Sequence, residues 1–294
     1  MTSDEYNDCG PVSGWDLHCH TVFSDGTKTP AELIDLACTS GLHGVAITDH
    51  DTTAGWREAQ QAAESQGFPL LRGSEITAQD GHVSVHMLAY QYDPENEGIV
   101  ELFRSTRQAR LERARRMVSR LSKDFPITWD DVTAQTKKGE NTTVGRPHMA
   151  DALVAAGFYR TRSEAFAGAI SSSSKYYIPT PSPTALRVVQ VVRLAGGVSV
   201  VAHPCDYSRN RVLLSDSQIR RLADAGLDGL EVWHRGNGDD GRRRLLKLAD
   251  ELDLLVTGGS DWHGAGKPNK LGENVTADDV VAQIVQRGAA GMVA

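Results

Sequence analysis

The sequence predicts an α/β fold, and three features of its pattern carry the prediction. Apolar segments typical of strands alternate with amphipathic segments typical of helices in the first and last parts of the 294-residue chain. Seven of these segments are typical of strands. The middle of the chain, by contrast, has an almost purely helical pattern. Alternation over about 200 residues favours a (β/α) barrel or a doubly wound sheet, and both arrangements stay open at this point.

Composition and charge narrow the class of protein. Hydrophobic residues make up 40% and charged residues 23%, as in ordinary globular domains. The 31 lysines and arginines against 38 aspartates and glutamates give a net charge of −7, which argues against a protein that coats nucleic acid or a membrane surface. There is no apolar run long enough for a membrane span and no signal-peptide pattern, and the four cysteines lack CxxC spacing. We expect a cytoplasmic protein that is a monomer or a weak oligomer.

The first part of the chain, residues 15–96, alternates strands and helices. Pro30 in a first helical turn and Gly41 as a C-cap bound one helix, and Gly67 ends the next. The turn signal Asp80-Gly81 lies between two consecutive strands, and a hairpin there would break the alternation. The sequence does not decide this point. The expected strands are 15–19, 44–48, 70–76 and 83–90, and the expected helices are 30–40 and 53–66.

Strand signals nearly vanish between residues 99 and 174 and then return. Helices are expected at 97–125, 128–135, 147–156 and 163–170, before a connector rich in serine and proline. The later strands are expected at 198–202, 229–233 and 254–257, and the later helices at 186–195, 216–225, 242–252 and 277–286. We therefore expect a flexible tail at 1–14, a strand–helix domain formed by 15–96 and 185–294, and a helical insertion at 97–184.

Side chains of the types that bind metals are expected at the C-terminal ends of six strands. His18 and His20 lie two apart on the first strand, so both imidazoles point to one face. Asp261 and His263 repeat that spacing after the last strand. The remaining candidates are Asp25, His50, Glu75, His86 and His203. Six histidines beside three carboxylates at strand ends predict a metal centre.

The size and charge of this ligand set predict more than one ion. Nine ligands are too many for one tetrahedral zinc ion. If three divalent ions share the nine ligands, with Glu75 bridging two of them, each ion keeps open coordination positions. The three carboxylates cancel only part of the charge of the ions, and the positive charge that remains matches a phosphate dianion plus one hydroxide. Mixed imidazole and carboxylate ligands suit Mn²⁺, Fe²⁺ or Zn²⁺ and disfavour Mg²⁺ or Ca²⁺. Such a site lowers the pKa of a bridging water and clamps the oxygens of an in-line displacement.

Seven motifs together resemble the PHP (polymerase and histidinol phosphatase) family over nearly the whole chain. They are DLHCHTVFSDGTKTPAELIDLA, VAITDHDT, GSEIT, HMLAY, GRPHMA, VVAHP and GSDWHG. The insertion with its RPH sequence resembles the subgroup of small stand-alone metal-dependent phosphoesterases that act on nucleotides. The resemblance implies a distorted (β/α)7 TIM-like barrel whose metal-binding mouth is covered by the helical insertion.

The resemblance also implies a ligand set for each ion. The implied sets are His18, His20, Glu75 and Asp261 for one ion, Glu75, His86 and His203 for a second, and Asp25, His50 and His263 for a third. Some relatives have histidine at the position of Asp25. An aspartate there lowers the charge of the site, suits manganese or iron, and is the pattern of the nucleotide-acting subgroup.

Other residues are expected to contact the substrate. Arg146-Pro147-His148 is typical of a helix start with a solvated arginine, but the resemblance favours Arg146 and His148 facing the ions, where arginine can hold phosphate oxygens. With the ligand Asp261, these are the expected catalytic residues. Lys175 and His234 are further candidates for substrate binding.

Several other side chains receive simpler interpretations. Arg113, Arg116 and Arg120 share one helical stripe that we expect to be solvated, and the alternative is that Arg113 contacts a second phosphate or a nucleotide at the rim of the pocket. Cys19 and Trp262 are expected to point away from their metal-binding neighbours and to serve in barrel packing. His43 and His82 are expected to have no role in the site.

The expected function is hydrolysis of small phosphomonoesters by a metal-bridging hydroxide. The subgroup resemblance implies removal of the 3′-phosphate from nucleoside 3′,5′-bisphosphates, with binding of AMP-like ligands. The alternatives are a 5′-to-3′ exonuclease on short oligoribonucleotides, a histidinol-phosphate phosphatase, an amidohydrolase, and an inactive PHP module that binds a partner. We expect neither long nucleic acid nor a membrane among its partners.

Overall fold

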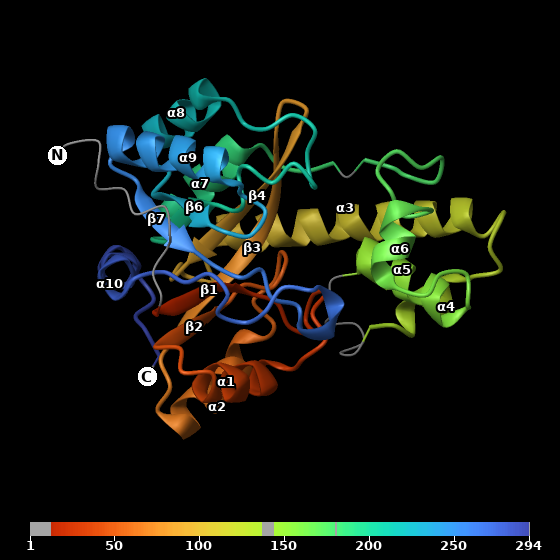
Figure 1. The fold of residues 1–294 in the computed structure, drawn as a ribbon, viewed down its shortest axis with the longest axis horizontal. Coiled ribbons are helices and arrows are strands. Elements are labelled where there is room, and N and C mark those ends of the chain that lie inside the picture. Colours follow the sequence, from red (N-terminus) through yellow and green to blue (C-terminus); the bar gives the residue numbers. More distant parts are fainter. Residues whose placement is uncertain (1–12, 137–143, 180, 294) are drawn as a thin grey trace.

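The computed structural model describes residues 13–136, 144–179 and 181–293, and seven strands form one sheet in sequence order. Figure 1 shows the strands at the centre of the larger part of the molecule. They are β1 (Trp15–Cys19), β2 (Gly44–Ile47), β3 (Leu70–Asp80), β4 (Val83–Tyr90), β5 (Val198–Val201), β6 (Gly229–Trp233) and β7 (Leu255–Gly258). The seven expected strands are confirmed. Residues 1–12 of the expected tail lie outside the described residues.

β3 and β4 form the hairpin that the sequence leaves undecided. They pair antiparallel from Gly73 opposite Tyr90 to Asp80 opposite Val83, and Gly81 has a φ of +60° in the turn. β4 also pairs antiparallel with β5, whereas the pairs β1–β2, β2–β3, β5–β6 and β6–β7 are parallel. β4 therefore runs against its neighbours. The pairing also carries β3 to Asp80, past the expected end at residue 76.

Contacts between β1 and the segment after β7 close the sheet into a barrel. The Trp262 N–H donates to the His18 carbonyl (3.1 Å), and the Trp262 carbonyl accepts from the His20 N–H (2.8 Å). The Asp16 side chain accepts from the Ser260 N–H at 2.9 Å. Because the two ends of the sheet are joined, the fold is a seven-stranded barrel and not an open doubly wound sheet.

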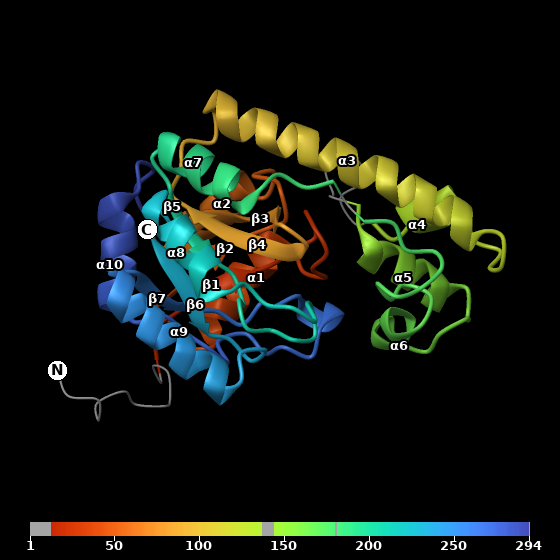
Figure 2. The same ribbon diagram turned by 90° about the horizontal axis from the view of Figure 1, so that it is seen from above.

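Six helices surround the strands (Figure 2). They are α1 (Pro30–Thr39), α2 (Trp56–Gln66), α7 (Ala185–Leu194), α8 (Asp216–Asp224), α9 (Asp239–Leu252) and α10 (Asp278–Arg287). α1 begins at a capping box formed by Thr29 and Glu32. α9 begins before the expected residue 242, because Gly238 caps the helix and Asp239 and Asp240 favour its positive N-terminal end.

The described part of the insertion contains α3 (Glu97–Leu121), α4 (Trp129–Thr133), α5 (Arg146–Ala155) and α6 (Arg162–Ala167). α3 belongs to two apolar cores. Its residues Ile99 and Phe103 pack in the barrel core, whereas Met117 and Leu121 pack with Met149 of α5 in a separate core. Figure 1 shows α3 running from the barrel to the far end of the insertion. The expected boundary at residue 97 thus falls on a helix whose first half belongs to the barrel core.

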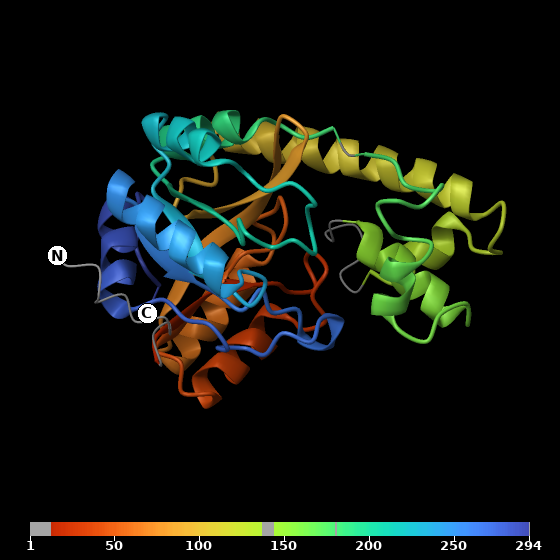
Figure 3. The same cartoon turned by 45° about the horizontal axis from the view of Figure 1, so that its top comes forward.

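Arginine side chains connect the insertion to the loops at the carboxyl ends of the strands. Figure 3 shows the helices of the insertion, in green, on the same side of the molecule as the red and blue loops of the barrel. Arg107 of α3 donates to the Asp51 carbonyl at 2.9 Å, and Arg110 lies 3.3 Å from the Asp51 carboxylate. Arg162 of α6 donates to the carbonyls of Asp25 (3.2 Å) and Gly266 (3.4 Å). Two sides of the barrel mouth are therefore bridged to the insertion.

Among the described helices, none has the combined length and hydrophobicity that a membrane span requires.

We predict that Asp16→Ala lowers the free energy of unfolding by about 3 kcal/mol. The fully buried carboxylate accepts hydrogen bonds from the Ser260 N–H and hydroxyl, the Gly272 N–H and the His18 N–H, and its loss leaves these donors without an acceptor. Urea denaturation followed by circular dichroism measures the change. Asp224→Ala, at an exposed position near the end of α8, is the matched control and should stay within about 0.5 kcal/mol of the wild type. Equal effects of the two substitutions would contradict the closure described above.

Candidate metal centre

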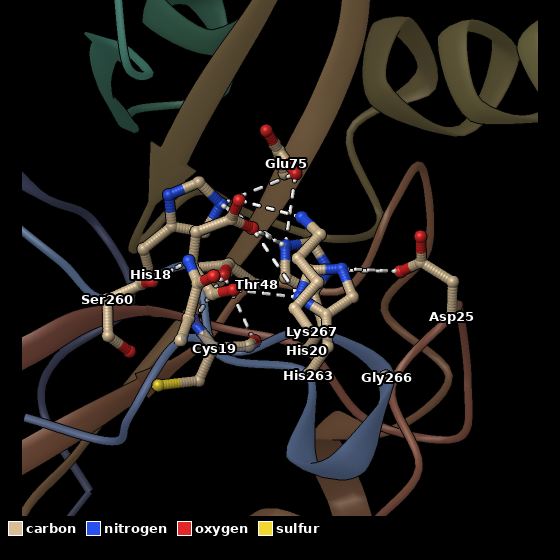
Figure 4. Close-up of polar contacts among 12 residues, drawn as sticks. His18, Cys19, His20, Asp25, Thr48, Glu75, Ser260, His263, Gly266 and Lys267 are labelled. Atoms are coloured by element: carbon tan, nitrogen blue, oxygen red, sulfur yellow. Dashed lines mark hydrogen bonds and ion pairs between the residues drawn. The ribbon is translucent and has the colours of Figure 1, made fainter. Parts of the chain in front are cut away.

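His18 and His20 stand at the end of β1. They flank Cys19, whose side chain packs in the apolar core, so both imidazoles project to the opposite side, as Figure 4 shows. Both histidines are fully buried. The expectation that Cys19 and Trp262 serve in barrel packing is confirmed, since both belong to the apolar core that the strands share with the surrounding helices.

Glu75 on β3 lies at the middle of the histidine cluster and is fully buried. Figure 4 shows its carboxylate directed at the imidazoles from β1. The nitrogen atoms around Oε2 are His20 Nε2 (3.0 Å), His50 Nδ1 (3.2 Å) and His18 Nε2 (3.3 Å), and those around Oε1 are His86 Nδ1 (2.6 Å) and His203 Nε2 (3.0 Å). One carboxylate thus faces five imidazoles from separate parts of the chain.

Asp261 and Asp25 complete the cluster on two sides. Oδ1 of Asp261 lies 3.4 Å from His20 Nε2 and 3.5 Å from both His18 Nε2 and His263 Nδ1. Oδ1 of Asp25 lies 3.0 Å from His263 Nε2, and its Oδ2 lies 3.9 Å from His50 Nε2. All nine side chains that the sequence pattern singled out as metal ligands are therefore brought together.

The ligand atoms fall into three overlapping groups, each within 4.8 Å of one another. The groups are His18, His20, Glu75 and Asp261; His50, Glu75 and His86; and His20, Asp25, His50 and His263. The first is identical to one implied ligand set. The second contains His50 in place of His203, although His203 also lies beside Glu75, and the third adds His20.

Two ligand positions differ from the expectation that every candidate follows its strand. His86 lies within β4, opposite Thr77 of β3, and reaches the mouth because β4 runs in the reverse direction. Glu75 lies inside β3, since that strand continues into the hairpin. The expectation of a C-terminal strand position is therefore wrong for these two residues, although both side chains join the cluster.

Two candidate ligands have unusual backbone geometry. His203 has a φ of +32° and Asp261 a φ of +53°, which are uncommon values for residues with a side chain. Such strain persists where the surrounding contacts fix it, and it is concentrated at functional sites.

The buried polar atoms of the cluster fit the binding of cations. Among the described residues, Glu75 Oε2, Asp261 Oδ1 and His263 Nε2 are buried without hydrogen-bond geometry to any partner. Burial opposes charge on the carboxylates, yet neighbouring cationic groups hold the pKa values of Glu75, Asp25 and Asp261 well below their usual range. Burial also opposes charge on His20, but Asp261 and Glu75 raise its pKa to about 9. Ionised carboxylates facing imidazole nitrogens are the donor set that divalent transition metals use.

Glu231 on β6 orients this cluster from behind, and sequence reasoning missed it. Its Oε1 lies 2.9 Å from His18 Nδ1, and its Oε2 accepts from the His203 N–H at 2.7 Å. With Nδ1–H of His18 bonded to Glu231, the Nε2 lone pair points into the cluster. The available signal was a glutamate inside the apolar strand GLEVW, where an acidic residue needs a partner.

Arg146 and His148 begin α5, as the sequence pattern predicts. His148 is buried, and its Nδ1 accepts from the Gly145 N–H at 3.2 Å. Burial lowers the pKa of His148, against the opposing effect of the Asp25 carboxylate. The Arg146 guanidinium lies over the rings of Phe166 and Tyr177, and burial followed by repulsion from neighbouring arginines lowers its pKa. Among the described residues, the hydrogen-bond partner of Arg146 is the Ile170 carbonyl.

Arg113 and Lys175 of the insertion have partners that the sequence pattern did not indicate. Arg113 is buried, donates to the Ile178 carbonyl and lies over the Tyr177 ring, so the expectation of a solvated face is wrong for it, while Arg116 and Arg120 are exposed. The Arg113 side chain is buried because the connector covers it, through Tyr177 and Ile178. The position of a residue on a helical stripe does not tell whether another segment covers it. Lys175 pairs with Asp124 at 2.9 Å on the insertion surface, and the structure shows no contact between it and the cluster.

Of the remaining histidines, one lies beside the cluster and two lie away from it. His234, after β6, is buried beside the cluster, with its ring 5.2 Å from that of His203. His43 is a partly exposed partner of Asp278, and His82 is exposed in the β3–β4 turn. Two further basic residues at the cluster, Arg209 and Lys267, lacked any sequence signal because they lie in loops without a motif.

Comparison with known proteins gives a family, two relatives and a solved structure that this chain resembles. Residues 16–145 match the family model described as PHP domain. The chain is 30% identical over 278 residues to the 5′-3′ exoribonuclease of Haemophilus influenzae, covering 93% of this chain and 98% of that protein. It is 31% identical over 259 residues to the 3′,5′-nucleoside bisphosphate phosphatase of Chromobacterium violaceum, covering 86% and 88%. A crystal structure from Bifidobacterium adolescentis, described as a candidate metal-dependent phosphoesterase, has 66% identity and a TM-score of 0.94 over 95% of this chain and 98% of that one.

We predict that Glu231→Gln weakens the binding of Mn²⁺ to the metal-free protein by about 10- to 100-fold, because the carboxylate that fixes the His18 tautomer is lost. Titration with Mn²⁺ followed by calorimetry measures the affinity. Glu101→Gln, on the exposed side of α3, is the matched control and should bind Mn²⁺ as the wild type does. Unchanged affinity in Glu231→Gln would show that the bond to His18 has no part in metal binding.

Proposed function

This chain belongs to the PHP domain family, and on that premise we propose that it removes the 3′-phosphate from nucleoside 3′,5′-bisphosphates. As a member of this family it is a metal-dependent hydrolase of phosphoesters. The observation that supports the proposal most is the convergence of His18, Glu75 and Asp261 with their neighbours at a mouth that the insertion partly covers. The named phosphatase of Chromobacterium violaceum aligns along 88% of its length.

We infer that the nine clustered side chains hold the ions. The sets that the family resemblance implies are His18, His20, Glu75 and Asp261; Glu75, His86 and His203; and Asp25, His50 and His263, and neighbouring pairs within each set lie close together. Three ions of manganese, iron or zinc suit this mixture of imidazole and carboxylate ligands. When bound, such ions supply an activated water and neutralise charge on the phosphate.

The protein's own side chains would orient the substrate. The Arg146 guanidinium has two N–H groups in a planar fork that can donate to two phosphate oxygens. His148 accepts from the Gly145 N–H at Nδ1, so its neutral ring carries a proton at Nε2, which can donate to the same phosphate. The contacts of Arg107 and Arg162 with the barrel limit the room above the cluster, which favours a small substrate.

A second candidate function is the trimming of short oligoribonucleotides from the 5′ end. Its support is the exoribonuclease of Haemophilus influenzae, which aligns along 98% of its length. Both reactions need the same ions, but trimming needs room for a nucleotide on each side of the cleaved bond. A single assay can therefore compare them.

We predict that the Mn²⁺-loaded protein releases phosphate from adenosine 3′,5′-bisphosphate faster than from AMP or histidinol phosphate. Short RNA carrying a 5′-phosphate is included, with mononucleotide release as its readout. Asp261→Ala should abolish activity, because it removes a carboxylate that faces three imidazoles of the cluster, while Asp224→Ala should retain it. Preferential cleavage of the RNA would replace the proposed function with the second candidate, and full activity of Asp261→Ala would refute the metal mechanism.

We further predict that Arg146→Ala lowers kcat/KM for the preferred substrate by about 100-fold, since one charged donor to the phosphate is lost. Steady-state kinetics gives the ratio, and metal content measured by mass spectrometry should stay unchanged. Arg116→Ala, on the exposed face of α3, is the control. A drop of similar size in both variants would point to disturbance of the insertion instead of a lost phosphate contact.

A further inference from the structure

Three basic side chains surround one oxygen of Asp261. Oδ1 of this carboxylate faces the imidazoles, whereas Oδ2 lies 2.6 Å from Arg209 Nη2, 2.7 Å from Lys267 Nζ and 3.8 Å from His234 Nε2. The three residues lie in separate loops, which follow β5, β7 and β6. Figure 4 draws Lys267 within the same cluster as His20 and His263. The arrangement is therefore made by tertiary structure.

Two carboxylates face the two cations, because Oδ2 of Asp206 also lies 3.4 Å from Arg209 Nε. The Asp261 carboxylate contacts the charged groups of both Arg209 and Lys267, and its other oxygen is turned to the candidate metal ligands. These two cations already hold the pKa of Asp261 well below its usual range, against the effect of burial. Once a divalent ion shares the carboxylate, positive charge is in excess on this side. Partly buried cations need an anion to offset their desolvation.

His234 provides an independent observation that points to a ligand. It is 2% exposed, and its Nδ1 accepts from the Gly236 N–H at 3.0 Å. With Nδ1 as an acceptor, Nε2 of the ring is the nitrogen that carries a proton and can donate. Within the described part of the chain, Nε2 is buried and has no hydrogen-bond partner. The nearest carboxylate oxygen, Asp261 Oδ2, lies 3.8 Å away, which is too far for a hydrogen bond, so this buried N–H is costly unless a ligand accepts a bond from it.

Arg209 lies between two candidate ligand residues. Its Nη2 donates to Asp261, and its Nη1 lies 3.3 Å from Nδ1 of His86. The Arg209 side chain is 25% exposed, so its guanidinium lies between the cluster and solvent. A planar fork, an ammonium and an imidazole N–H, which come from three directions, match the oxygens of a tetrahedral dianion better than a flat carboxylate.

We propose that Arg209, Lys267 and His234 form a phosphate-binding edge on the barrel side of the cluster, which holds the non-bridging oxygens of the phosphate that is cleaved. The inference rests on the proposed function, because it assigns these residues to the phosphate of that substrate. Arg146 and His148 would contact the same phosphate from the insertion side. Donors on both sides of the mouth would then fix its orientation without adding ligands to the ions.

The test is calorimetric binding of inorganic phosphate to the Mn²⁺-loaded protein, with metal content measured on each sample. We expect Arg209→Gln and Lys267→Met each to weaken phosphate binding by about tenfold while keeping the full metal content. Arg209→Lys should recover part of the affinity. Arg221→Gln, which breaks an exposed ion pair with Asp80, is the matched control and should bind phosphate as the wild type does.

His234 offers a separate check, because glutamine can keep a donor near the position of Nε2 whereas alanine cannot. We expect phosphate affinity to fall in His234→Ala and to be retained in large part in His234→Gln. Wild-type affinity in Arg209→Gln and Lys267→Met would overturn the proposal. So would a loss of metal in these two variants, because they would then act only by holding Asp261.

The phosphate-binding measurement and the hydrolysis assay on bisphosphates can fail independently of one another. Phosphate binding that depends on these residues, in a protein that does not hydrolyse bisphosphates, would support the phosphate-binding edge and refute the proposed substrate. Hydrolysis of bisphosphates together with wild-type phosphate affinity in the variants would refute the edge alone.

Discussion

The buried carboxylate of Glu75 is the interaction on which the rest of the site depends. An ionised carboxylate inside a protein is costly unless cationic or hydrogen-bonding groups surround it. Here five imidazoles approach its two oxygens, from β1, from β4 and from the segments after β1, β2 and β5. The ends of these strands must therefore converge on one point. The barrel meets this requirement, since its strands share a common mouth.

The reversed direction of β4 is part of the same constraint. A parallel β4 would present its last residues at the mouth, whereas the hairpin presents its first half and brings His86 opposite Thr77. Glu231 then ties β6 to two histidines that come earlier in the chain, through His18 Nδ1 and the His203 N–H. The carboxylate in the middle and the carboxylate behind it together fix the orientation of the imidazoles. The unusual backbone at His203 and Asp261 is consistent with side chains that are held by such contacts.

The insertion was foreseen as a helical segment, but the roles of its arginines were not. The helical period correctly placed Arg113 and Arg116 near one another, yet one is buried beneath Tyr177 and the other is exposed. Arg107 and Arg110 use Asp51 as an anchor, next to the candidate ligand His50. A spacing of three or four residues gives the face of a helix, and only the neighbouring segment decides whether that face is covered.

The sequence by itself determined the seven strands, the helical insertion and the nine clustered side chains, because strand and helix periods and residue chemistry are local properties. The strand–helix alternation left open the barrel against the open sheet, although the resemblance to the PHP family implied the barrel, and it left the hairpin undecided. Tertiary structure decided these, along with the contacts of Glu231, Arg209 and Lys267. Asp16 and Ser260, which help to close the barrel, are 244 residues apart in sequence. Such pairs form only when distant segments pack together, so no local pattern in the chain records them.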